Sequence, residues 1–293
     1  MPLLVKAGHK VTALTRLPDR TAQLAQMGAV PVLGDVYDEA RLARLVADSE
    51  AEVVIHQLTA FGTKHGDPYA ETIRVRIDGT RSLLAAARAA GARRFIAQSI
   101  SFMCSPSGSG LTDEETPLYL DAPPAARALA EAVASLERQT LDASGMSGTV
   151  LRYGWFYGPG TSYDPQGTIP TAIRNGAMPL VGAGASTYSF INLRDAAAAT
   201  LRVLGRDATG IYNIVDDSPV RLSEWLPFVA KLLGAPAPGH EDVAAARKRI
   251  GDLRVYYMNE QRGASNAKAK REFDWQPAVP SWRAGFEALY RAT

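Results

Sequence analysis

Short apolar runs alternate with longer amphipathic segments along the first half of the chain. The five runs are apolar at consecutive positions, which is typical of strands buried on both faces of a parallel sheet. The segments between them carry apolar residues at helical spacing, and glycines stand where three of them end, at Gly28, Gly91 and Gly145. The predicted strands are Lys10–Thr15, Ala29–Gly34, Glu52–Leu58, Arg94–Ile100 and Thr149–Tyr153, and the predicted helices are Asp19–Met27, Asp38–Ala47, Tyr69–Ala90 and Pro123–Ala143.

The pattern changes after about Gly158, where glycine and proline become frequent and the apolar runs shorten. Helices are predicted over Asp195–Leu204, Ser223–Leu233 and Glu241–Ile250, with short strands between them. Strands that alternate with helices predict a doubly wound, Rossmann-like α/β fold with a parallel sheet. We therefore expect a Rossmann-like domain over residues 1–157 and a smaller substrate lobe over residues 158–293, with returns of the lobe to the main sheet left open.

Composition narrows the class of protein. The chain has 293 residues, of which 46% are hydrophobic and 21% charged, and this is typical of a globular protein with a sizeable core. A net charge of +2 argues against a nucleic-acid partner. The single cysteine, Cys104, suits a reducing compartment, and neither a membrane span nor a signal peptide is evident. We expect a cytoplasmic protein with a small-molecule ligand, and the sequence leaves a homo-oligomer open.

Seven segments, in order, carry a resemblance to a known family. They are KAGHKVTALTR, GDVYDEARL, VVIHQLTA, RIDGTRSLLAAARAAGARRFIAQSIS, LRYGWFYGPGT, YSFINLRDAAAA and IYNIVDD. In this order the chain resembles the extended short-chain dehydrogenases/reductases, the NAD(P)-dependent epimerases and dehydratases. The resemblance implies a sheet with strand order 3-2-1-4-5-6-7 and a dinucleotide bound across the carboxyl ends of the strands.

The first departure from the family lies at the start of the chain. The family's first strand and glycine fingerprint, which hold the cofactor pyrophosphate, would precede Met1. The glycine-rich residues 182–186 open no long helix and do not replace the fingerprint. A missing central strand leaves backbone groups unpaired, so the gap must be filled or closed. We expect the natural start to lie upstream of Met1; a rearranged sheet and a strand from another chain are the alternatives.

The second departure concerns the proton-transfer chemistry of the family. Its catalytic Tyr and Lys stand four residues apart on one helix, and alignment places Leu129 and Val133 at their positions. No Lys occurs between Lys64 and Lys231. The family's third catalytic residue is a Ser, which Ser99 matches at the end of a predicted strand, with Ser101 as the alternative register. The Tyr/Lys mechanism is therefore predicted to be absent, with Ser99 as the one catalytic candidate.

The resemblance also suggests residues for the cofactor and the substrate. On the cofactor side the candidates are Arg16, Asp35 and Thr59. A basic residue after the second strand, such as Arg16, accommodates the 2′-phosphate of NADP, so NADP is predicted if upstream residues exist and no cofactor otherwise. Two of these candidates also have a structural interpretation, Arg16 as a surface arginine and Asp35 as a turn residue after a strand. On the substrate side the candidates are Arg76, Tyr153 and Tyr157.

Other chemistry finds little support in the sequence. His56 and His65 lack metal-ligand spacing, and no metal site is predicted. A hydrolytic triad of Ser99, His56 and Asp35 lacks the G-x-S-x-G elbow, and His56 in an apolar strand is better explained as a structural residue. Two functions remain. One is an atypical epimerase/dehydratase-like enzyme acting on a small metabolite or biosynthetic intermediate, and the other is a non-catalytic ligand-binding or regulatory protein.

Overall fold

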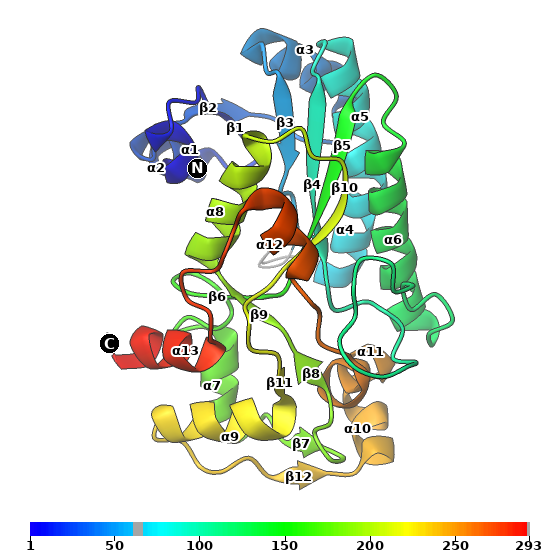
Figure 1. The fold of residues 1–293 in the computed structure, drawn as a ribbon, viewed down its shortest axis with the longest axis vertical. Helices are drawn as coiled ribbons and strands as arrows, with labels where there is room; N and C mark the ends of the chain where they lie inside the picture. The colour runs from blue at the N-terminus through cyan, green and yellow to red at the C-terminus, as the bar shows by residue number, and fades with distance from the viewer. Residues whose placement is uncertain (61–66, 292–293) are drawn as a thin grey trace. The chain divides into compact units, whose positions relative to one another are not determined.

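The chain forms two compact units that interleave along the sequence. The computed structural model describes residues 1–60 and 67–291 (Figure 1). The first unit comprises residues 1–99, 132–151 and 200–211, and the second comprises residues 100–131, 152–199 and 212–293. The chain thus passes from one unit to the other several times.

The first unit begins with a small parallel pair of strands. α1 (Pro2–Lys6) leads into β1 (Thr12–Thr15), and β1 pairs in parallel with β2 (Val30–Leu33), so that Thr12 lies opposite Val30. The connection is η1 (Pro18–Arg20) followed by α2 (Thr21–Gln26). Gly28, which ends α2, has a φ of 82°, as its predicted role as a helix stop requires.

A separate four-stranded sheet has the order β10-β5-β4-β3. β3 and β4 are parallel, with Val53 opposite Arg94 and His56 opposite Ala97. The strands are β3 (Val53–His56), β4 (Arg94–Ile100), β5 (Ser147–Tyr153) and β10 (Gly210–Ile214). All five strands predicted for the first half are present, as is the predicted alternation with helices, so the α/β fold with a parallel sheet is confirmed.

The two sheets follow the order expected from the family resemblance with one strand left out. In the family's numbering, the pair β2-β1 corresponds to strands 3 and 2, and the sheet β3-β4-β5-β10 corresponds to strands 4 to 7. The family's strand 1 would lie between β1 and β3. Within residues 1–60 and 67–291, β1 pairs only with β2 and β3 only with β4. The two sheets are thus separate among the described residues, and the resemblance implies that the missing first strand would join them.

Helices pack against one face of the four-stranded sheet and form the core of the first unit. α3 (Glu39–Ser49) contributes Leu42, α5 (Thr80–Ala89) contributes Leu83 and Leu84, and these side chains share a cluster with Phe95 of β4. α6 (Pro124–Leu141) adds Leu136 to the same cluster. α8 (Leu193–Leu204) connects residues of the second unit to those of the first.

The helix predicted over Tyr69–Ala90 differs from the prediction in one detail. The structure has α4 (Pro68–Arg74), a π-helical turn η2 (Val75–Gly79) and then α5. The hydroxyl of Thr80 donates to the carbonyl of Arg76 at 2.6 Å within this turn. Single π turns inside helices occur frequently at functional sites, and apolar periodicity does not reveal them.

The second unit is built from three short strand pairs and a set of helices around an aromatic core. The strand pairs are β6–β9, β8–β11 and β7–β12. The core contains Tyr157, Tyr163, Phe190, Trp225 and Phe286. The strands are β6 (Trp155–Tyr157), β7 (Leu180–Val181), β8 (Thr187–Tyr188), β9 (Phe190–Asn192), β11 (Val220–Arg221) and β12 (His240–Glu241), and the helices are α7 (Thr168–Arg174), α9 (Leu222–Leu232), α10 (Val243–Ile250), α11 (Asp252–Val255), the π turn η3 (Tyr256–Glu260), α12 (Ala267–Phe273) and α13 (Trp282–Arg291).

Candidate functional site

The face of α6 that should carry the family's acid–base pair is apolar and buried. Leu129 has 2% of its surface exposed and Val133 has 0%, and Leu136 and Thr140 continue the face. Leu and Val side chains cannot ionise, so they can neither donate a proton nor lower the pKa of a neighbouring hydroxyl. Leu129 and Val133 therefore contribute packing, and the absence of the Tyr/Lys mechanism remains a prediction.

Ser99, the catalytic candidate at the end of β4, is engaged inside the protein. Its hydroxyl donates to Oε1 of Glu137 on α6 at 2.7 Å, and its exposed surface is 0%. A serine hydroxyl has a single proton to donate, so the proton of Ser99 is committed to this carboxylate. Ser101, the alternative, is buried as well, and its backbone N–H donates to the carbonyl of Tyr153. A catalytic role for Ser99 remains a prediction.

His56 has the geometry of a structural histidine. The proton of Thr80 goes to the carbonyl of Arg76, so Thr80 can only accept from Nε2 of His56, at 3.1 Å. The other ring nitrogen, Nδ1, accepts the backbone N–H of Leu58. Burial, with a smaller contribution from the Arg76 guanidinium, lowers the pKa of His56 to about 3. The ring is therefore neutral, with its proton on Nε2.

The cofactor-side candidates follow three strands of the first unit. Arg16 is exposed directly after β1, and Thr59 is exposed after β3. Asp35 follows β2, and its Oδ1 accepts the backbone N–H of Tyr37 at 3.0 Å, as in an Asx turn. These positions suit the adenosine half of a dinucleotide. Within the described residues no strand lies between β1 and β3 to present a phosphate loop, so they do not fit a whole dinucleotide.

The glycine-rich segment 182–186 forms a turn between β7 and β8. Gly182 and Gly184 both have a φ of 57°, and no helix follows them before β8 begins at Thr187. A phosphate loop needs a helix N-terminus behind it, so this segment does not replace the missing fingerprint.

The substrate-side candidates are buried in different surroundings. Arg76 lies in the π turn η2 of the first unit with 4% of its surface exposed. Tyr153 and Tyr157 belong to the second unit, where the ring of Tyr157 packs 4.9 Å from that of Phe286. Burial, reinforced by the nearby Asp216 carboxyl, raises the pKa of Tyr157. Tyr157 is part of the core of its unit, and substrate binding by these three residues remains a prediction.

A buried carboxyl group beside Tyr157 was not predicted. Oδ1 of Asp216 accepts the backbone N–H of Ser218 at 3.0 Å, whereas its Oδ2 is buried with no hydrogen-bond partner among the described residues. Burial raises the pKa of Asp216 to about 8, and the charges of Asp217 and Asp195 act in the same direction. Burial thus favours the protonated form of Asp216, which the sequence motif IYNIVDD does not reveal.

A cluster of rings beyond the ends of β4 and β5 was also missed by the sequence analysis. Phe102 stacks on Trp155 with ring centroids 4.0 Å apart, and Tyr257 contacts both rings edge-on. The available signal was that Phe102 and Trp155 each stand two residues past a strand. Nothing in the sequence near either residue indicated that Tyr257 joins them.

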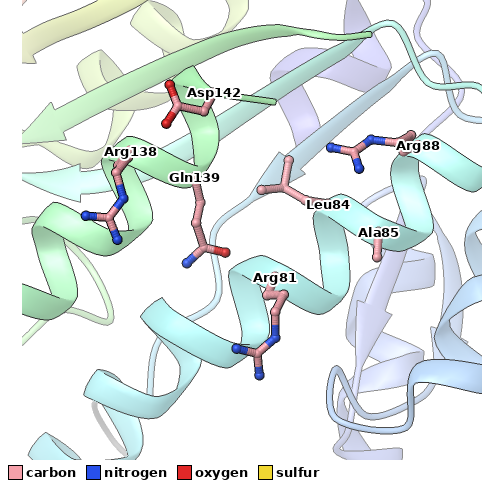
Figure 2. A pocket seen from close by; sticks show the side chains of 7 residues that line it. All are labelled: Arg81, Leu84, Ala85, Arg88, Arg138, Gln139 and Asp142. Atoms are coloured by element: carbon pink, nitrogen blue, oxygen red, sulfur yellow. The ribbon is translucent and has the colours of Figure 1, made fainter. Parts of the chain in front are cut away.

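A surface groove of about 310 Å³ lies between α5 and α6 (Figure 2). None of the predicted site residues lines it. Its lining residues are Arg81, Leu84, Ala85, Arg88, Arg138, Gln139 and Asp142. Gln139 is held in place, because its side-chain amide donates to the carbonyl of Ile77.

The described residues form neither a cluster of metal-ligating side chains nor a helix that could span a membrane. Within residues 1–60 and 67–291, no group of three or more His, Cys, Asp or Glu side chains is placed to hold a metal ion. In the same part of the chain, no helix combines the length and the apolar character needed to cross a membrane.

Comparisons with known proteins point to one family. A sequence model of the NAD dependent epimerase/dehydratase family matches residues 1–215. A 3-diazoavenalumate denitrifying reductase from a Streptomyces species is 40% identical over 95% of this chain and 91% of its own. Among solved structures, UDP-glucose 4-epimerase from Thermotoga maritima, determined with UDP-glucose, superposes with a TM-score of 0.77 at 20% identity, covering 99% of this chain and 92% of its own. The dTDP-glucose 4,6-dehydratase of Bacillus anthracis, determined with NAD, gives 0.76 at 18% identity, covering 99% of this chain and 90% of its own.

Proposed function

Because the chain belongs to the NAD dependent epimerase/dehydratase family, we propose that it is a reductase-type enzyme that acts on a small biosynthetic intermediate without a Tyr/Lys pair. The observation that supports the proposal is the burial of Leu129 and Val133 on α6, at the positions that the alignment assigns to that pair. The 40% identity to a denitrifying reductase supports reduction as the reaction type. The nucleotide-sugar enzymes among the solved structures are more distant in sequence.

The proposal includes a nicotinamide cofactor, which supplies a hydride when bound. A dehydratase of the same fold was solved with NAD, and this supports a dinucleotide. Arg16, exposed after β1, favours NADP, because a basic side chain there accommodates the 2′-phosphate. The described residues supply only the adenosine side, so the proposal is tested on a chain to which a first strand and a glycine loop are added.

The surroundings of α6 limit how protons are handled. The Ser99 hydroxyl donates its hydrogen bond to Glu137, and α6 offers no ionisable group at Leu129 or Val133. A product oxygen would find no protein acid on this helix face. We therefore infer that the substrate delocalises the negative charge that develops on reduction, or takes its proton from water.

The second candidate is a protein that binds the same class of ligand without turning it over. The internal Ser99–Glu137 hydrogen bond favours it, because a serine engaged with a buried carboxylate has no proton to offer a substrate. Cofactor binding without turnover would distinguish this candidate from the enzyme.

The test is a turnover assay on the chain extended ahead of Met1 by a strand and a glycine loop. After NADPH binding is confirmed, NADPH consumption is measured over a panel of small ketones, diazo compounds and sugar nucleotides. Tyr119→Phe and Tyr153→Phe serve as variants, because these two tyrosines lie nearest in sequence to the α6 positions. We expect turnover within about threefold of the parent in Tyr119→Phe and a loss of at most about tenfold in Tyr153→Phe, which is a predicted substrate residue, whereas loss of a true acid–base group costs ~10²–10⁴-fold. A loss of about 100-fold in either variant would show that the catalytic Tyr has moved. Bound NADPH without consumption would favour the non-catalytic candidate.

A further inference from the structure

Three aromatic rings of the second unit form a continuous platform, defined here as Phe102, Trp155 and Tyr257. Phe102 and Trp155 are stacked, with an interplanar angle of 16° and centroids 4.0 Å apart. Tyr257 stands nearly perpendicular to both, at 5.7 Å from Phe102 and 5.2 Å from Trp155. The indole N–H of Trp155 has no acceptor among the described residues, so ring packing positions this side chain without help from a hydrogen bond of the indole.

The platform lies where a doubly wound sheet binds its ligands. Phe102 follows the last residue of β4 by two positions, and Trp155 follows the last residue of β5 by two. The N–H of Ser101 donates to the carbonyl of Tyr153 at 2.9 Å and fixes these two strand exits beside each other. Ligands of open α/β sheets bind outside the carboxyl ends of the strands. Tyr257 belongs to η3, a π-helical turn of the kind that is frequent at functional sites.

The stacked pair of the platform is more exposed than the aromatic core of the same unit, although Trp155 packs against that core through Tyr188. Phe102 and Trp155 are both only partly buried. The core rings, by contrast, are enclosed: Tyr157, Phe190, Trp225 and Phe286 each have 0% of their surface exposed. The second unit can therefore enclose large rings fully, yet it leaves this stacked pair partly uncovered at the strand ends. Covering a partly exposed aromatic surface with another apolar ring is favourable.

We propose that the platform binds a planar aromatic ring of the substrate, which extends the Phe102–Trp155 stack. The inference rests on the proposed function, because it names the substrate class of that same enzyme. A conjugated ring also satisfies the chemical requirement set by α6, since it delocalises the charge that no protein acid neutralises. Stacked and edge-to-face arrangements are both favourable for aromatic rings, and the platform contains one stacked pair and two edge-to-face contacts.

The experiment compares two neutral probes with the same carbon skeleton. β-Naphthol is planar and aromatic, whereas decahydro-β-naphthol is fully saturated and carries the same hydroxyl. Calorimetric titration of the 293-residue chain without cofactor measures both dissociation constants. We expect β-naphthol to bind about tenfold more tightly, because only the planar ring can stack.

Matched variants assign the binding to the platform. Phe102→Leu and Trp155→Leu should each weaken β-naphthol by about threefold to tenfold and leave the saturated probe nearly unchanged. Phe102→Tyr keeps a ring and should retain β-naphthol binding, which guards against a folding defect in the leucine variants. Phe228→Leu is the control, because Phe228 is a partly buried ring of the same unit that packs against Trp282 and not against the platform.

Three outcomes would overturn the inference: no binding of β-naphthol, equal affinity for the two probes, or an equal loss in Phe228→Leu. The proposed function fails separately, in the turnover assay of the extended chain. Preferential binding of β-naphthol without turnover would support the aromatic platform and contradict the proposed enzymatic function. Turnover without preferential binding of β-naphthol would support the enzymatic function and contradict the platform.

Discussion

β3 and β4 are neighbours in one parallel sheet and have similarly apolar sequences, yet they differ in burial. Phe95, Ile96 and Ala97 of β4 have no exposed surface, whereas Val53, Val54 and Ile55 of β3 are each only partly buried. β4 has a strand on both sides, and β3 pairs only with β4 in the part of the chain that the structure describes. The apolar pattern thus predicts a strand, but the neighbouring strands decide how far it is buried.

β1 resembles β3 in being an apolar strand that is only partly buried. All four of its residues, Thr12–Thr15, are partly buried, and it pairs only with β2 among the described residues. Both strands were predicted from their sequences to lie inside a sheet, yet they are buried only as far as edge strands are. An edge strand presents unpaired backbone N–H and C=O groups, which can pair with a further strand. The difference between β3 and β4 is therefore expected to disappear when a strand lies between β1 and β3.

The largest expected effect comes from supplying that strand. A chain extended ahead of Met1 by an apolar strand and a glycine loop should bind NADPH with a dissociation constant of about 10 μM or below, whereas the 293 residues should not reach this affinity. The glycine loop provides backbone N–H groups for the pyrophosphate, and the strand pairs with β1 and β3. Calorimetric titration measures the binding, and thermal unfolding should show a higher Tm for the extended chain.

Two variants of the extension distinguish the effect of the glycine loop on NADPH binding from the effect of the added strand on stability. Replacing the loop glycines with valine should abolish NADPH binding but keep the gain in Tm. A proline in the middle of the added strand should remove the gain in Tm, because proline cannot donate to the sheet. Binding of NADPH by the 293-residue chain below about 10 μM would contradict the assignment of the missing strand.

A smaller effect compares the two strands directly. Phe95→Ala should lower the free energy of unfolding by ~3–5 kcal/mol, because it leaves a cavity in a closed core. Val54→Ala in β3 should cost about 1 kcal/mol, since its side chain is already partly in water. Urea unfolding of both variants measures the two costs. In the extended chain the cost of Val54→Ala should rise, and equal costs of the two substitutions in the 293-residue chain would break the comparison.

The sequence was sufficient to predict the helices and strands, but it was not sufficient to predict contacts between residues that are distant along the chain. The strand predicted over Arg94–Ile100 is confirmed with the same bounds, because its apolar run is local information. The π turn at Val75–Gly79 could not be predicted, because it retains the helical pattern of apolar residues. Glu137 as the acceptor for Ser99, and Tyr257 beside Phe102, depend on tertiary packing that brings together residues distant in sequence. A single sequence contains no direct signal for such pairs.

The smallest expected effect concerns His56, the one residue of β3 that is fully buried. The pKa of His56 is lowered to about 3 by burial and by Arg76, against an ordinary value of 6.5. Between these two pH values the unfolded chain binds a proton that the folded chain does not. Stability therefore falls as pH decreases through this window, by up to about 1.4 kcal/mol per pH unit, and by about 2 kcal/mol between pH 7 and pH 5.

His56→Gln isolates this contribution, because glutamine does not titrate and its amide can still donate to Thr80. Urea unfolding of the parent and the variant at pH 7 and pH 5 gives the two losses in stability. The other histidines contribute equally to both proteins and cancel in the difference. We expect the variant to lose about 2 kcal/mol less than the parent between these pH values. The same loss in both proteins would mean that His56 can accept a proton in the folded state. In that case the end of β3 would be as open to water as its first three residues, and the contrast with β4 would extend along the whole strand.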